Sequence, residues 1–286
     1  MTERTKLYWV YGISVIFIFL NILMILRDFY WLLFVPLIIV IALLYIFSMD
    51  KVLLLITLLT PFSVYLVHSE FNLGVSLPAE PLMLGVLIIF LLKIIGGYGF
   101  DRKILRHPLS IAIMINLAWI FVTTLTSEIP MVSVKFLIAR LWFVIPFFFL
   151  AVVLFKKFSN TKKFIWLYTI GLAVVVIYTT IHHANYGFDE QAGNWVMKPF
   201  YNDHTAYGAV LAMFVPFLLA FIFDKSYSFS VRMSSFFVFL ILLTGLFLSY
   251  SRAAWISVAV GLLVYFIILL KIKFKYLLGI FIVLVV

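Results

Sequence analysis

The sequence predicts an all-α polytopic membrane protein, and three observations carry this prediction. The 286 residues are 66% hydrophobic and only 11% charged, with a mean hydropathy of +1.23. Apolar runs recur along the whole chain without the strand-like alternation of membrane barrels. Lys and Arg gather in alternate connections between these runs. Because a lipid-facing backbone must satisfy its own hydrogen bonds, we expect each run to be a helix.

The apolar runs predict one transmembrane domain, residues 1–286, with about ten complete spans and a truncated eleventh. The expected segments are 9–26, 29–47, 52–67, 80–95, 109–126, 141–155, 164–181, 204–223, 233–249, 253–270 and 276–286. The last segment holds only eleven residues after Lys275, whereas a spanning helix needs about 20. We therefore expect the chain to be a fragment whose last helix continues outward.

The distribution of Lys and Arg predicts that the N-terminus lies in the cytoplasm. In that orientation sixteen of the 21 basic residues fall on the inner side. The outer five are Arg27, Lys135, Arg140, Lys198 and Arg252. Seven of the eleven acidic residues fall on the same outer side, namely Asp28, Glu70, Glu80, Glu128, Asp189, Glu190 and Asp203. Orientation accounts for the net charge of +10, so nucleic acid is not an expected partner.

Missing sequence features exclude several classes of enzyme. The chain has no cysteine, which excludes disulfides, thiol catalysis and thiolate metal sites. It also lacks an Asp-x-Asp pair, a phosphate-binding Gly-x-x-x-x-Gly-Lys loop, a His-Glu-x-x-His motif and a Gly-x-Ser-x-Gly motif. We therefore expect no metal and no cofactor, and nothing supports an ATP-driven pump, a zinc protease or a serine hydrolase.

Two outer arginines are candidate functional residues. Arg252 lies between two apolar runs, where insertion of an arginine costs roughly 2.5–3.5 kcal/mol. The connection before it is so short that Arg252 must lie at or just below the outer surface. Arg140 ends a segment, 131–140, that we expect to be a short amphipathic helix near the interface. Arg140 either extends to the interface beside a tryptophan or contacts an anionic group of the outer leaflet.

The other outer connections hold the remaining polar candidates. Residues 182–203 form the longest outer loop, and Asn202 or Asp203 can cap the helix that follows. His204 then lies in the first turn of that helix, near the water boundary. We interpret Glu80, in the connection from His68 to Pro81, as part of a solvated turn that starts the next helix.

Two short segments resemble a known family. Residues 202–208 read Asn-Asp-His-Thr-Ala-Tyr-Gly, and residues 248–255 read Leu-Ser-Tyr-Ser-Arg-Ala-Ala-Trp. Their order and spacing resemble the O-antigen ligase/polymerase superfamily, in which an Asn-containing segment precedes a later Ser-Arg motif. Arg140 also lies where these proteins carry a first outer arginine. The resemblance covers roughly residues 130–270, so residues 128–286 correspond to the family's membrane core.

The resemblance implies transfer of a glycan at the outer face of the bacterial cytoplasmic (inner) membrane. The implied donor is a glycan on undecaprenyl diphosphate, and the acceptor is lipid A–core, another glycan or a protein. Arg252 would be catalytic, and the implied diphosphate- and glycan-binding residues are Arg140, Asn202, His204, Ser251 and Arg252. The reaction would be inverting and independent of metal. In the family a histidine on a later outer loop activates the acceptor; that loop would follow Val286, so we expect the fragment to be inactive.

Two other functions stay open. A transporter or flippase of a lipid-linked or amphipathic solute needs interrupted helices and two repeated halves. Pro61, Pro146 and Pro216 could interrupt helices, although the chain shows no clear two-fold recurrence. A scaffold subunit without catalytic activity is the third possibility.

Overall fold

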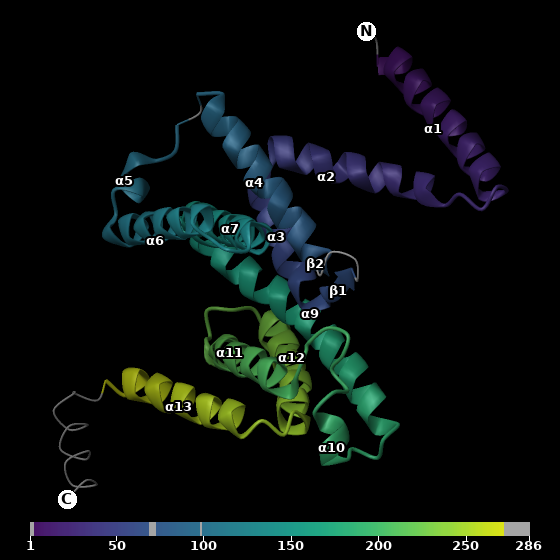
Figure 1. Ribbon diagram of the computed structural model, residues 1–286. Coiled ribbons are helices and arrows are strands. Elements are labelled where there is room, and N and C mark those ends of the chain that lie inside the picture. Colours follow the sequence, from purple (N-terminus) through teal and green to yellow (C-terminus); the bar gives the residue numbers. More distant parts are fainter. Residues whose placement is uncertain (1–2, 69–72, 98, 272–286) are drawn as a thin grey trace, which may run out of the picture. The chain divides into compact units, whose positions relative to one another are not determined.

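The computed structural model describes residues 3–68, 73–97 and 99–271 (Figure 1). The chain divides into two compact units, residues 1–52 and 53–286. In the first unit, α1 (Glu3–Ile25) is followed by the short η1 (Trp31–Phe34) and by α2 (Val35–Phe47). Most apolar side chains of α1 and α2 are exposed, as expected for helices that face lipid.

The boundary between the two units falls within a helix that is followed by a β-hairpin. Helix α3 (Met49–Leu59) passes into η2 (Thr60–Phe62), and strands β1 (Val64–His68) and β2 (Leu73–Leu77) follow. The strands are antiparallel, with Val64 opposite Leu77 and Leu66 opposite Val75. The prediction of one helical span over 52–67 is therefore wrong. Pro61 cannot donate the N–H that would continue the helix, and the β-branched residues after it favour a strand.

The next helices pack into a second, smaller core. They are α4 (Ala79–Ile95), the short α5 (Arg102–Leu105), α6 (Pro108–Leu125), α7 (Pro130–Val144), the π-helical η3 (Ile145–Leu150) and α8 (Ala151–Phe155). Helix α7 packs against α4 and α6, and buried Leu87 and Phe149 belong to one apolar cluster.

Helix α7 corrects a second prediction. Residues 131–140 are not a separate interfacial helix, because α7, η3 and α8 run on without a break as one 26-residue apolar helix, Pro130–Phe155. Pro146 lies at the start of the π-helical turn, where its missing N–H is accommodated. Arg140 therefore lies about 15 Å along this helix from Pro130, at 1.5 Å per residue.

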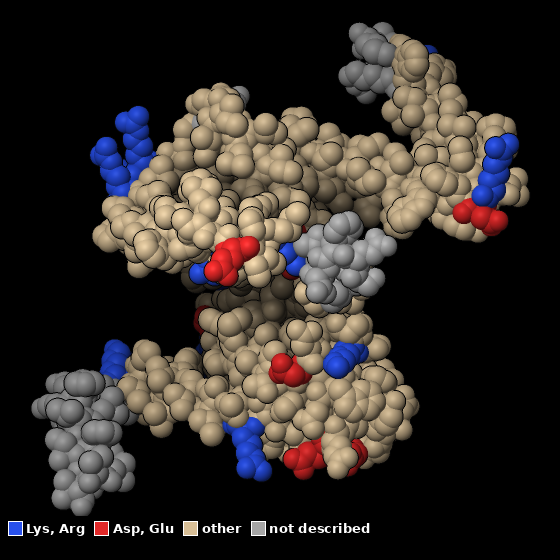
Figure 2. Space-filling model, in the orientation of Figure 1, with Lys and Arg blue, Asp and Glu red and all other residues tan. Residues whose placement is uncertain are grey.

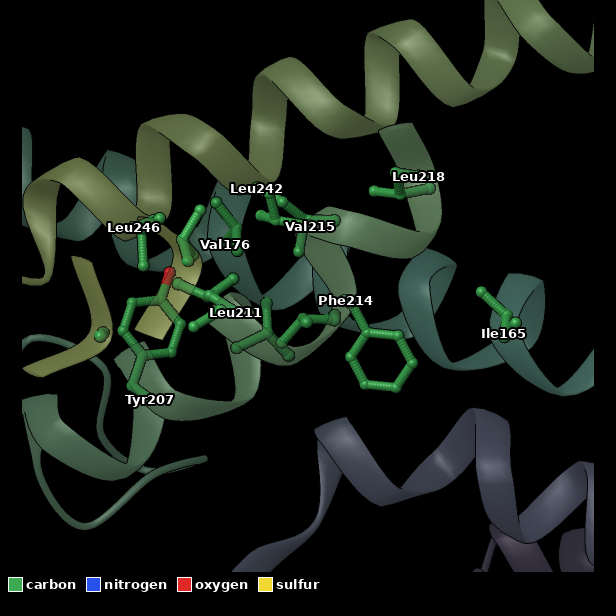
Figure 3. Packing of buried hydrophobic residues seen from close by; sticks show 14 of the residues in the cluster. Ile165, Val176, Tyr207, Leu211, Phe214, Val215, Leu218, Leu242 and Leu246 are labelled. Carbon is green, nitrogen blue, oxygen red and sulfur yellow. The ribbon is translucent and has the colours of Figure 1, made fainter. Parts of the chain in front are cut away.

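The main core lies among the last long helices. They are α9 (Phe158–Ala184), α11 (His204–Phe223), α12 (Phe229–Leu248) and α13 (Arg252–Leu269), with the short α10 (Glu190–Gly193) in the loop between α9 and α11. Helix α11 packs against α9, α12 and α13. Its Tyr207, Leu211 and Phe214 are almost completely buried, and Tyr207 and Leu211 lie next to Val176 of α9 and Leu246 of α12 (Figure 3).

The helix lengths confirm a multi-span helical membrane protein. Seven described helices are long and apolar enough to cross a membrane: Leu7–Ile25, Pro108–Leu125, Pro130–Phe155, Phe158–Ala184, His204–Phe223, Phe229–Leu248 and Arg252–Leu269. The apolar helix Trp31–Phe47 is shorter. Few charges interrupt the surface in the view of Figure 2. Seven such helices are fewer than the ten complete spans expected, since α3 and α4 have only 11 and 17 residues.

Candidate functional site

The turn between α12 and α13 carries three polar residues, of which Ser249 and Ser251 are buried and Tyr250 is half-buried. Ser249 is completely buried; its hydroxyl donates to the Leu246 carbonyl at 2.8 Å and accepts from the Ser251 N–H at 3.4 Å. The Ser251 hydroxyl caps α13 by accepting from the Ala254 N–H at 3.4 Å. These bonds satisfy polar groups of the turn, so that α13 begins at Arg252. The Arg252 side chain itself is exposed.

Gly208 brings the start of α11 into contact with the turn between α12 and α13. A Cβ atom on Gly208 would lie 3.0 Å from the Cβ atoms of Ser251 and Ala254 and 3.1 Å from the Ser249 hydroxyl. Only a glycine lets α11 approach the turn so closely without displacing it. Segments 202–208 and 249–254, which are separated by a whole helix in the sequence, therefore form one structural unit.

The long loop between α9 and α11, residues 185–203, folds onto the same turn. The Tyr250 hydroxyl donates to the Phe188 carbonyl at 2.8 Å, and a Cβ atom on Gly193 would lie 2.7 Å from the Tyr250 ring. Tyr250 has a φ of 49°, in the left-handed region, which directs its ring to this loop. Buried His183 bonds the Asp189 carbonyl through Nε2 at 2.8 Å. His183 therefore has a structural bond inside the loop.

The start of α11 settles which residue caps it. Asp203 accepts a hydrogen bond from the Ala206 N–H at 2.8 Å, so the cap is Asp203. Asn202 is exposed and holds no capping bond, and His204 is half-exposed as the first residue of the helix. Burial raises the pKa of the neighbouring Tyr201 hydroxyl, which therefore stays protonated. The side chains of Asn202 and His204 are both accessible to a ligand.

Arg140 lines a different part of the unit. It borders a cavity of about 650 Å³. Among the residues that the structure describes, Glu80 is the only other charged residue of this lining. The lining also includes aromatic residues of α7 and α9, and Phe200 from the loop between α9 and α11, only two residues before Asn202. Arg252 does not line this cavity, so the structure groups Arg252 with Ser251 and Gly208, and Arg140 with Glu80.

The cavity wall formed by α3 and η2 presents hydrogen-bond acceptors. The hydroxyls of Thr57, Thr60 and Ser63 each donate to a carbonyl four residues earlier, at 2.8, 2.7 and 3.2 Å. Their oxygen lone pairs remain as acceptors for a ligand. Together with the Glu80 carboxylate, they fit a ligand rich in hydroxyl groups. Arg140 fits a phosphate, and the aromatic lining fits an apolar chain.

Comparison with known proteins adds no relative. No family model, curated protein or solved structure matches this chain. Within the described part of the chain, no group of three or more His, Asp or Glu side chains could hold a metal ion.

Glu80 and Tyr250 are the site residues that the sequence interpretation missed. Glu80 was assigned to a solvated turn, but it lies in the first turn of α4 and lines the Arg140 cavity. The cavity wall that includes Thr60 and Ser63 cannot be recognised from the sequence, because it forms only where helix α3 ends at Leu59. The sequence weakly indicates the packing role of Tyr250. An aromatic side chain between two serines in so short a turn must pack against another part of the chain.

Proposed function

We propose that this chain is the membrane core of a glycan ligase or polymerase of the O-antigen ligase type. It transfers a glycan from undecaprenyl diphosphate to an acceptor at the outer face of the bacterial cytoplasmic membrane, without a metal ion. The acceptor is lipid A–core, another glycan or a protein. The N-terminus lies inside, and the shorter helices complete a bundle of about ten spans. The observation that carries the proposal is the contact of Gly208 with the Ser249–Ala254 turn, which joins the two family-like segments beside an exposed arginine.

Arg252 suits the chemistry of this transfer. When the anomeric C–O bond breaks, negative charge develops on the departing diphosphate, and fixed cations must stabilise it. A guanidinium has permanent charge and two parallel N–H donors for phosphate oxygens. Arg252 is also the first residue of α13, where the helix dipole favours an anion. In the family that the chain resembles, a histidine on a later outer loop takes the proton of the acceptor hydroxyl. The acceptor oxygen then attacks the face opposite the diphosphate, the diphosphate leaves, and the anomeric carbon is inverted.

The remaining residues have supporting roles in this proposal. Arg140 binds the diphosphate or an acidic part of the glycan from the cavity that it shares with Glu80. Asn202 and His204 contribute hydrogen bonds to the glycan from the exposed start of α11. Ser251 holds the first turn of α13 in place, and thereby positions Arg252.

The test is substitution of Arg252 in the natural gene, expressed in its own host. Arg252→Ala removes one charged contact to the leaving group, a loss of about 2.7–4 kcal/mol or 10²–10³-fold in rate. Arg252→Lys keeps the charge but loses the bidentate geometry, so an intermediate rate is expected. Arg27→Ala, which removes another outer arginine, serves as the matched control. Acceptor glycosylation is read from a gel ladder, and membrane level from an immunoblot. Wild-type glycosylation by Arg252→Ala at a normal membrane level would contradict the proposal.

A flippase or transporter is the second candidate, because interrupted helices border the Arg140 cavity. Helix α3 breaks at Thr60-Pro61, and the π-helical turn at Pro146 follows Arg140 on the same helix. The two functions differ in where the lipid-linked glycan accumulates when Arg252 is replaced. A transferase defect leaves it in the outer leaflet, where an externally added glycosidase digests it. A flippase defect leaves it protected in the inner leaflet.

A further inference from the structure

A second cavity lies at the opposite ends of the helices, away from the residues proposed for transfer. It has a volume of about 800 Å³ and is lined by the start of α9, the end of α11, the following connection and the second half of α13. The distribution of Lys and Arg predicts that these helix ends lie on the cytoplasmic side. Next to the cavity, α11 and α13 are in contact where a Cβ atom on Gly261 would lie 3.6 Å from the Pro216 ring.

Beyond that close approach, the cavity is lined mainly by apolar side chains. Its lining from α13 extends from Leu262 to Leu269, a length of about 10 Å along the helix. One leaflet of hydrocarbon is about 15 Å deep, half of the ~30 Å core. The lining therefore extends over about two thirds of the depth of one leaflet. The volume of the cavity is within the range of small-molecule sites. This shape fits the acyl chain of a phospholipid that enters from the inner leaflet.

Two opposite charges lie at the polar end of the cavity. Lys162 places its ammonium nitrogen 4.3 Å from the centre of the Tyr227 ring and 5.4 Å from that of Phe158. These rings hold the ammonium by cation–π attraction. Asp224 is the second charge, and its carboxylate accepts a hydrogen bond from the Ser226 N–H at 2.8 Å. Among the described lining residues, no others are charged.

The charge pattern distinguishes between phospholipid headgroups. A purely anionic headgroup would be attracted by Lys162 but repelled by Asp224. A zwitterionic headgroup with a primary ammonium can place its phosphate at Lys162 and its ammonium at Asp224. A primary ammonium also donates three N–H bonds, which a quaternary ammonium cannot do. The N–H of Ser226 lowers the pKa of Asp224, so the carboxyl group is ionised at neutral pH.

We propose that this inner cavity is a binding site for phosphatidylethanolamine, with its phosphate at Lys162, its ammonium at Asp224 and one acyl chain among the aromatic side chains of α11 and α13. The site does not depend on glycan transfer. It ties the inner ends of α9, α11 and α13 to one lipid, so the bound lipid stabilises the packing of these helices.

The test is competitive lipid binding to the purified, delipidated protein, measured by native mass spectrometry. Phosphatidylethanolamine, phosphatidylglycerol and phosphatidylcholine with identical acyl chains are the probes. The wild type should bind phosphatidylethanolamine about tenfold more tightly than either other lipid, a difference of about 1.4 kcal/mol. Asp224→Asn keeps the oxygen that accepts from Ser226, so folding is retained. This variant should lose the preference over phosphatidylglycerol.

Two further variants separate a specific site from a generally basic surface. Lys162→Gln should weaken the binding of phosphatidylethanolamine and phosphatidylglycerol together, because both lose a phosphate partner. Lys163→Gln, the matched control, removes an exposed neighbouring charge that does not line the cavity, and should change neither. Equal losses in Lys162→Gln and Lys163→Gln would overturn the proposal. So would a wild-type preference for phosphatidylglycerol, or an unchanged preference in Asp224→Asn.

Discussion

Gly208→Val tests whether the close packing of α11 against the Ser249–Ala254 turn positions Arg252. A Cβ atom at residue 208 alone would lie 3.0 Å from Ser251 and Ala254, 0.4 Å short of an ordinary contact at 3.4 Å. The two valine methyl groups extend about 1.5 Å further. The turn must therefore move by roughly 1 Å or more, and Arg252, as the first residue of α13, moves with it. Misplacement by 1 Å can cost about 10²-fold in rate.

The same substitution has a stability cost that can be measured separately. Overpacking of this kind costs about 1–3 kcal/mol, and each kcal/mol lowers Tm by roughly 2–4 °C for a protein of this size class. Gly12→Val is the matched control, because no atom lies within 4 Å of a Cβ atom at that helical position. Transfer is measured by acceptor glycosylation in the host, and Tm by a thermal melt in detergent.

The transfer rates and Tm values of these variants show whether the packing of Gly208 against the turn positions Arg252. We expect Gly208→Val to lose transfer at a normal membrane level and to melt several degrees below Gly12→Val. Gly208→Ala should show a smaller defect, since the turn has to move by only about 0.4 Å. If Gly208→Val behaves like Gly12→Val while Arg252→Ala is inactive, the proposed function stands, but this account of how Arg252 is positioned is wrong.

Three other predictions concern the cavity, the packing and the sidedness. Glu80→Gln should reduce glycosylation by about tenfold, because an amide accepts a hydrogen bond from a sugar hydroxyl more weakly than a carboxylate does; a rate unchanged from wild type would remove Glu80 from the site. Gly171→Ala should lower Tm despite the better helix propensity of alanine, because the new Cβ atom would lie 2.6 Å from the Leu58 carbonyl oxygen, and a higher Tm would contradict this contact. The chain has no cysteine, so single cysteines can be introduced: an impermeant maleimide added to intact cells should label Lys198→Cys and not Lys225→Cys, and the reverse pattern would invert the topology.

Helix positions in the C-terminal half could be predicted from the sequence, and the contacts between them could not. Hydropathy predicts α11, α12 and α13 to within four residues and the start of α9 six residues late, because each helix must satisfy its backbone hydrogen bonds within lipid. The cap at Asp203, one of two candidates, also follows from a local rule. The contact of Gly208 with Ser251 depends on how two helices cross, and no local pattern encodes that crossing.

The N-terminal half shows where hydropathy misleads. A strand and a helix of equal apolarity have the same mean hydropathy, so residues 52–67 were assigned to one span. The hairpin forms because β1 pairs with β2, with Val64 opposite Leu77. Hydropathy averaged along the chain does not report this pairing between two segments. The cavity shared by Glu80 and Arg140 depends on this change of structure, since the helix that ends at Leu59 leaves Thr60 and Ser63 to line its wall.

Helix α11 contributes residues to both proposed sites. Substitutions at its two ends should therefore have separate effects on glycan transfer and on lipid binding. Its N-terminal end holds Gly208 against the Ser249–Ala254 turn. Its C-terminal end, from Phe217 to the C-cap Asp224, lines the second cavity. The two places are at least nine residues apart, about 14 Å along the axis, and have no described lining residue in common. Substitutions at sites this far apart are usually additive. Gly208→Val should thus leave the lipid preference unchanged, and Asp224→Asn should leave glycosylation unchanged in cells. A transfer defect in Asp224→Asn would instead mean that the inner lipid controls the outer site through α11.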